Sequence, residues 1–147
     1  MIKPVGSDEL QPLFVYDPDK HHQLMHEAQE LPSVVISSQA AGNAVMMGGG
    51  YFSPLQGFMT VADAVSVAET MKTTDGMFFP VPVMCMLESV DAIHGVKRIA
   101  LRDPNMEGNP VLAVMDVEAI ETVSDEQMAL MTDKVYRTDD PEHPGVA

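Results

Sequence analysis

Apolar residues recur with helical spacing in two stretches of the chain, and a capping signal precedes each stretch. The first stretch spans residues 18–30, where Asp17 supplies an N-cap acceptor and a proline occupies the first helical position. The second stretch begins at Thr60, and Asp63 three residues later forms an acidic variant of the capping box. Both stretches are therefore predicted to be amphipathic helices.

Two further helices are indicated by their boundaries more than by their periodicity. A short helix capped by Ser38 is expected to end just before the triple glycine at residues 48–50, because glycine favours the helix terminus. A last helix begins at Ser124, where Gln127 completes a capping box, and it runs to about Lys134.

Three short runs are predicted to be strands. Residues 33–37 are rich in β-branched side chains, which favour extended structure. Residues 98–103 alternate between polar and apolar, as a half-buried strand does, and residues 110–117 supply the returning strand of a hairpin. These runs predict antiparallel pairing within a small sheet.

The segment at residues 78–87 is apolar on both sides and is bounded by turns, so a buried strand is predicted there. Pro80 and Pro82 each lack an amide donor and share one side of the chain, so that edge is expected to be free or bulged. Without a clear alternation of strands and crossover helices, the pattern predicts an α+β domain with a small antiparallel sheet or barrel.

The loop at residues 48–59 is unusual because it is apolar although its glycines and proline exclude regular structure. Ordinary surface loops are polar, so this segment is predicted to be a rigid packed turn. Its expected packing anchors are Tyr51, Phe52, Leu55 and Phe58.

Composition narrows the class of protein. A length of 147 residues fits one domain, and a single Cys excludes an internal disulfide. The N-terminus carries no apolar leader, and the longest apolar run, residues 77–87, is too short to span a bilayer, so a cytoplasmic protein without a membrane segment is expected. A formal net charge of -14 argues against nucleic-acid binding and against a self-contained site for an anionic substrate.

Histidines on the first predicted helix are the main candidates for a metal site. His22 and His26 lie four residues apart and share a helix face that Glu30 continues, whereas His21 points about 100° away from His22. The alternative is an exposed polar face with a local His–Glu pair, and it is favoured because no HExxH order is present.

The other chemically interesting residues have structural explanations that are favoured. The triple glycine follows a helix, unlike a phosphate cradle, and Cys85 lies in an apolar run without a cationic neighbour. Basic residues cluster at Lys97, Arg98 and Arg102, which could contact an anion or a partner domain or form surface ion pairs. The remaining candidates include three serines without a nucleophile context, namely Ser37, Ser38 and Ser53. Two carboxylate pairs are interpreted as solvated faces, namely Asp139 with Asp140 and Glu118 with Glu121.

Several segments, in the same order along the chain, resemble the N-terminal domain of ATP sulfurylases (sulfate adenylyltransferases). Residues 50–59, Gly-Tyr-Phe-Ser-Pro-Leu-Gln-Gly-Phe-Met, resemble the family signature GGFSPLxGFM, and residues 99–104 match IALRDP. The other similar segments are residues 31–42, 75–83, 109–115, 135–139 and 143–146.

This resemblance implies a PUA-like domain with a small, mostly antiparallel, partly barrel-like β-sheet and flanking helices. It implies a domain at residues 1–140 and, at residues 141–147, the start of a connection to a catalytic domain. The family makes adenosine 5′-phosphosulfate and pyrophosphate from ATP and sulfate with magnesium, through a QxRNPxHxxH motif that does not occur in this chain.

No catalytic, cofactor-binding or metal residue is therefore assigned to this chain, which is expected to be inactive alone. Its expected partners are the catalytic domain and, as a possibility, further copies of itself. The alternatives from other classes are an autonomous PUA-like module that binds RNA or a small molecule, and a small metal protein that uses the histidine helix.

Overall fold

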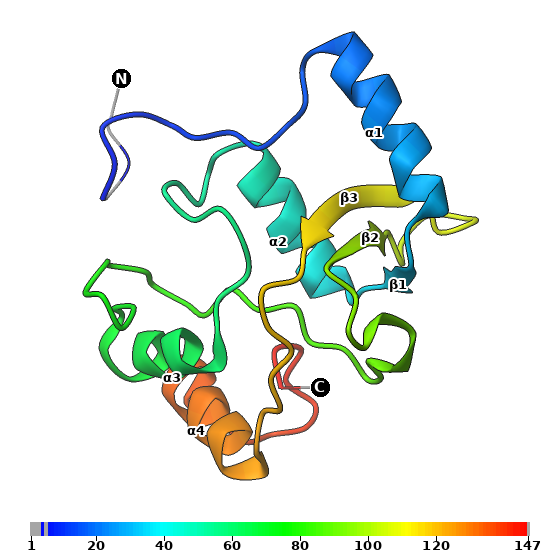
Figure 1. The fold of residues 1–147 in the computed structure, drawn as a ribbon. Helices are drawn as coiled ribbons and strands as arrows, with labels where there is room; N and C mark the ends of the chain where they lie inside the picture. The colour runs from blue at the N-terminus through cyan, green and yellow to red at the C-terminus, as the bar shows by residue number, and fades with distance from the viewer. Residues whose placement is uncertain (1–3, 5, 147) are drawn as a thin grey trace. The chain divides into compact units, whose positions relative to one another are not determined.

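The computed structural model describes residue 4 and residues 6–146 of the chain (Figure 1). Four α-helices, three strands and one 3₁₀ turn account for its regular structure in this range. In chain order they are α1 (Pro18–Glu30), β1 (Ser33–Val35), α2 (Ser38–Gly48), α3 (Val61–Thr70), the 3₁₀ turn (Asp91–Ile93), β2 (Arg98–Arg102), β3 (Val111–Asp116) and α4 (Asp125–Tyr136).

These elements form two compact units, and each unit is built from two separate parts of the chain. The first unit comprises residues 1–58 and 85–120 and contains the sheet, and the second comprises residues 59–84 and 121–147 and contains α3 and α4. The domain boundary at residue 140 stays a prediction.

The sheet of the first unit is mixed and open. Its strand order is β1-β2-β3, with β1 parallel to β2 and β2 antiparallel to β3. The predicted hairpin is confirmed by the register that pairs Ile99 with Met115 and Leu101 with Ala113. The expected antiparallel character holds for only one of the two strand pairs. The sheet does not close on itself in the described range, so a barrel-like form is not confirmed.

Helices cover both faces of the central strand, β2. Ile99 and Leu101 share one face and belong to a buried cluster with Ile36, Ala40 and Ala41, which places the start of α2 on that face. The opposite face carries Ala100 and the flanking arginines, and α1 contacts β2 and β3. The predicted strand is therefore confirmed, but its expected half-burial is not, because Ile99, Ala100 and Leu101 are all buried.

The N-caps that were predicted from single residues are largely confirmed. Asp17, Thr60 and Ser124 each accept a hydrogen bond from a backbone N–H of the first helical turn, and Ser124 forms the full capping box. The cap of α2 is Ser37, whose side chain accepts from the Ala40 amide, rather than Ser38 as predicted. Either serine precedes a run of good helix formers, so the sequence pattern alone does not separate them.

The predicted buried strand at residues 78–87 is wrong. This segment is irregular, and the ladder contact that the described chain forms there is an isolated bridge between Lys72 and Phe78. Phe79 and Val83 are buried, whereas Phe78 and Val81 are about half exposed. The prolines explain the difference, since two missing amide donors within three residues prevent a continuous strand ladder.

In the second unit, α3 packs against α4, with Ala64, Val67 and Met131 buried. The Asp63 carboxylate accepts hydrogen bonds from the Thr74 amide at 2.9 Å and from the Thr74 hydroxyl at 2.6 Å. These bonds stabilise the charged carboxylate and lower the pKa of Asp63 below its ordinary value. The interaction fixes the turn that follows α3, in which the Gly76 amide donates to the Thr73 carbonyl at 2.9 Å.

Candidate functional site

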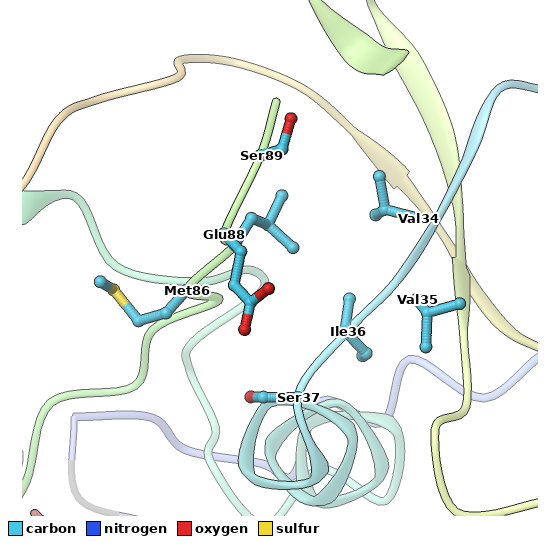
Figure 2. A pocket seen from close by; sticks show the side chains of 8 residues that line it. Val34, Val35, Ile36, Ser37, Met86, Glu88 and Ser89 are labelled. Atoms are coloured by element: carbon cyan, nitrogen blue, oxygen red, sulfur yellow. The ribbon is translucent and has the colours of Figure 1, made fainter. Parts of the chain in front are cut away.

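A pocket of about 460 Å³ lies in the first unit between strand β1 and an extended segment of the chain (Figure 2). One wall is formed by residues 34–37 and the other by residues 86–89. The volume falls within the range of small-molecule sites, about 300–1,000 Å³. Five of the eight lining side chains are apolar, so the chemistry of the pocket depends on its three polar residues.

Those polar residues do not form a reactive arrangement. The Ser37 hydroxyl caps α2 through the Ala40 amide at 3.1 Å, and the Ser89 hydroxyl bonds the Asp91 carboxylate at 3.0 Å. Among the described residues that line the pocket, Glu88 is the one carboxylate, and no Lys, Arg or His accompanies it. A nucleophile needs an adjacent base and an anion needs cationic donors, so the lining suits neither acyl nor adenylyl transfer.

The histidines of α1 do not assemble a metal site in the described structure. His21, His22 and His26 are all exposed, and within residues 4 and 6–146 no three His, Cys, Asp or Glu side chains gather closely enough to hold a metal ion.

Cys85 is half-buried and packs against the buried cluster around Ile99. Removal from water disfavours the thiolate and raises the pKa of the Cys85 thiol to about 11. The expectation of a structural thiol therefore agrees with its surroundings, although its burial is only partial.

We expect the Cys85 thiol to react slowly with a disulfide reagent such as DTNB at pH 8. With a pKa of about 11, the reactive thiolate is only about one part in a thousand at pH 8. The rate should rise about tenfold per pH unit up to about pH 10, because the thiolate fraction rises in that proportion, and unfolding in urea should abolish the protection. A native thiol that reacts at pH 8 as quickly as the unfolded chain would contradict this assignment.

The basic cluster is largely engaged inside the first unit. Arg98 Nε lies 2.7 Å from a Glu27 carboxylate oxygen of α1, and its Nη1 lies 2.9 Å from Asp116 of β3. Arg102 donates to the Ser33 hydroxyl at 2.9 Å and to a loop carbonyl at 3.1 Å. Ion pairing within the domain was the favoured interpretation and is confirmed for Arg98, which leaves Lys97 as the exposed member of the three.

One member of each carboxylate pair bonds a backbone amide. Glu121 accepts a hydrogen bond from the Val61 amide at 2.9 Å and so satisfies a donor at the start of α3. Asp140 accepts from the Glu142 amide at 2.9 Å. These contacts are those of caps and turns, and they use the carboxylates to satisfy backbone donors.

The glycine-rich loop ends α2 and is held by the N-terminal segment, residues 11–14. Gly49 is the C-cap of α2, and Gly50 adopts a φ of 78°. The Gly48 carbonyl accepts hydrogen bonds from the amides of Leu13 and Phe14 at 2.9 and 3.0 Å. The predicted helix stop is therefore confirmed, whereas the part that residues 11–14 play in completing it was not predicted.

Ser53 is the buried polar centre of this contact. Its hydroxyl donates to the Gly50 carbonyl at 2.6 Å and accepts from the Gln11 amide at 2.7 Å. Ser53 is 7% exposed, and its peptide bond to Pro54 is cis. The third candidate serine is therefore a structural link between two segments of the chain.

The predicted packing of the aromatic anchors is only partly correct. Phe58 packs against the buried cluster and Phe52 and Leu55 are half-buried, but Tyr51 is 74% exposed. The Tyr51 ring lies over Gly49, on the outside of the loop. Glycine allows this close approach because a Cβ at position 49 would meet the ring at 2.7 Å.

Tyr51 belongs to a surface that the sequence pattern did not predict. The Phe14 ring covers Gly48, just as the Tyr51 ring covers Gly49. The rings of Phe14 and Tyr16 make an edge-to-face contact, with centroids 6.2 Å apart. The Tyr51 amide donates a hydrogen bond to the Met46 carbonyl at 3.0 Å. We call this surface the aromatic patch and define it as Leu13, Phe14, Tyr16, Met46 and Tyr51. All five members are at least 40% exposed.

Comparisons with known proteins identify the fold family. The family model described as a PUA-like domain matches residues 2–147, and the chain belongs to this family. No helix of the described part is long and apolar enough to cross a membrane.

The relatives that this chain matches are sulfate adenylyltransferases. The chain is 73% identical over 146 residues to the sulfate adenylyltransferase of Allochromatium vinosum and 69% identical to that of a Riftia pachyptila sulfur-oxidizing endosymbiont. Both matches include 99% of this chain but only 37% and 33% of those relatives. The chain therefore spans about a third of the sulfate adenylyltransferases it matches, and the resemblance noted in the sequence is confirmed.

A solved structure supports the same relationship. The chain superposes on a hexameric APS kinase from Thiobacillus denitrificans with a TM-score of 0.66 and 32% identity, over 84% of this chain and 24% of that one. Here too the match is to a domain-sized part of a longer polypeptide.

Proposed function

We propose that this chain is the N-terminal structural domain of a sulfate adenylyltransferase, the enzyme that forms adenosine 5′-phosphosulfate and pyrophosphate from ATP and sulfate. In this proposal the domain supplies a folded scaffold and a contact surface, and the remainder of the enzyme supplies the chemistry. ATP and magnesium are bound by that remainder, and the enzyme is cytoplasmic.

The observation that carries the proposal is the extent of the match. An identity of 73% extends over nearly the whole chain, yet the matched region is only 37% of the relative. Adenylyl transfer requires cationic groups aimed at phosphate oxygens. A chain with 8 basic and 22 acidic residues, in which Arg98 and Arg102 bond within the domain, is poorly equipped for that task.

The proposal also includes the domain boundary of the chain and the oligomeric assembly of the complete enzyme. Residues 1–140 form the domain, and residues 141–147 begin the connection to the catalytic part. The hexameric neighbour supports the idea that enzymes containing such a domain assemble into oligomers. We therefore propose that the complete enzyme forms a homo-oligomer, whose subunit contacts lie within this domain or in the remainder of the enzyme.

The test is pyrophosphate release from ATP and sulfate with magnesium present. The purified chain should show no turnover, and a chimera in which it replaces the matching part of the A. vinosum enzyme should be active. Turnover by the isolated chain at a rate similar to that of the intact relative would overturn the proposal. So would an inactive chimera whose two parts are shown to be folded.

A further inference from the structure

The aromatic patch exposes much more ring surface than the fold of the first unit requires. Tyr16 and Tyr51 are 75% and 74% exposed and Phe14 is 48% exposed. With about 200 Å² per aromatic side chain, these fractions leave on the order of 400 Å² of ring surface in contact with water. A patch of this size is about the largest that a typical monomer exposes, and such a patch is often functional.

The patch is fixed in place, which favours a binding role over accidental exposure. The backbone of residues 13 and 14 is bonded to the Gly48 carbonyl, and the rings of Phe14 and Tyr51 lie on consecutive glycines at the end of α2. Because glycine has no side chain, each ring can lie close to the backbone of the glycine that it covers. Rigid aromatic side chains lose little conformational entropy on binding and dominate interface energetics.

Acidic residues flank the patch along the chain. Asp8 and Glu9 precede it, and Asp17 and Asp19 follow it at the start of α1. The whole chain carries a formal net charge of -14. A second copy would bring the same acidic flanks against this surface, which charge repulsion disfavours. The partner that fits is apolar at its centre and basic at its rim.

We propose that the aromatic patch docks onto the remainder of the sulfate adenylyltransferase chain, an inference that rests on the proposed function. About two thirds of the relatives' length lies outside the region that this chain matches. An enzyme part that binds ATP and sulfate must carry cations, so it is the charge complement of an acidic domain. Domain interfaces within a chain bury about 600–1,500 Å², and the patch supplies the apolar centre of such an interface.

The test uses a double variant, Tyr16→Ser with Tyr51→Ser, in two settings. In the isolated chain the double variant should lower the melting temperature only by the small amount that follows from losing the Phe14–Tyr16 ring contact and the packing of Tyr51 over Gly49, because both tyrosines are mostly exposed. In the chimera with the A. vinosum remainder, the melting temperature should fall by at least about 4 °C more than in the isolated chain, because docking contacts are lost in addition. The matched control is Met106→Ser, which is 59% exposed in the loop between β2 and β3 and should leave both melting temperatures unchanged.

The outcomes separate this inference from the proposed function. An active chimera whose melting temperature falls no further than that of the isolated chain in response to the double variant overturns the docking proposal alone. A chimera that is folded but inactive with all patch residues intact overturns the proposed function and the docking proposal with it. Light scattering of the isolated chain completes the test, since a dimer that the double variant converts to monomer would assign the patch to a second copy and overturn the proposal.

Discussion

Replacing Ile99 by alanine is expected to lower the free energy of unfolding of the chain by about 4 kcal/mol. Ile99 is fully buried on β2, and its side chain belongs to the cluster with Ile36, Ala40, Ala41, Ile93 and Leu101. The cluster joins the sheet to the start of α2 and to the 3₁₀ turn, so a cavity there is enclosed by three elements that cannot all move to fill it.

Urea unfolding followed by circular dichroism measures this effect. Met106→Ala is the control, because Met106 is 59% exposed and its truncation should change the free energy of unfolding by less than about 0.5 kcal/mol. Equal effects of the two substitutions would show that β2 is not the centre of the core.

Replacing Gly50 by alanine is expected to destabilise the chain by about 2–3 kcal/mol, through backbone strain and a steric clash. Gly50 has a φ of 78°, a conformation that costs a residue with a Cβ about 1–2 kcal/mol. The added Cβ would also lie 3.0 Å from the backbone nitrogen of Pro12 and 3.2 Å from its Cα. Backbone atoms cannot turn aside as a flexible side chain can, so the N-terminal segment must shift and its bond to Ser53 is weakened.

Gly57→Ala in the same loop is the matched control. A Cβ added at Gly57 would meet no heavy atom within 4 Å, and Gly57 is not among the residues with positive φ in the described range. Its substitution should leave the urea midpoint within experimental error of the parent. If Gly50→Ala is as stable as Gly57→Ala, the contact between residues 11–14 and the glycine-rich loop is not formed as described.

The features that could be predicted from the sequence are those encoded by a few neighbouring residues. Asp17, Thr60 and Ser124 each mark a helix start because the cap bonds an amide three residues away. The hairpin of β2 and β3 is likewise local, since only a short loop separates its strands.

The features that were missed depend on contacts between distant residues. The parallel pairing of β1 with β2 joins Ser33 to Ala100, and nothing near either residue indicates this partner. The link from Gln11 to Ser53 has the same character, with a separation of 42 positions in the sequence. The prediction for residues 78–87 failed for another reason, because apolar content was given more weight than the missing donors of Pro80 and Pro82.

The candidate site likewise has features that neighbouring residues encode and features that depend on contacts between distant residues. That the QxRNPxHxxH motif does not occur in this chain was evident directly from the sequence, and the family resemblance followed from consecutive residues such as 50–59. The aromatic patch was not evident, because it combines residues 13–16 with residues 46–51 through backbone contacts at α2. Tyr51 was expected to be buried because it is apolar, whereas its exposure is what gives the patch its proposed role.

As we propose, these 147 residues support the enzyme without taking part in its chemistry. Calorimetric titration of the purified chain with magnesium–ATP, with and without sulfate, examines this directly, because catalytic residues must contact the substrates. We expect no saturable heat from the chain and clear binding by the A. vinosum chimera under the same conditions. Saturable binding of ATP to the isolated chain, with an affinity similar to that of the chimera, would show instead that the domain carries part of the substrate site.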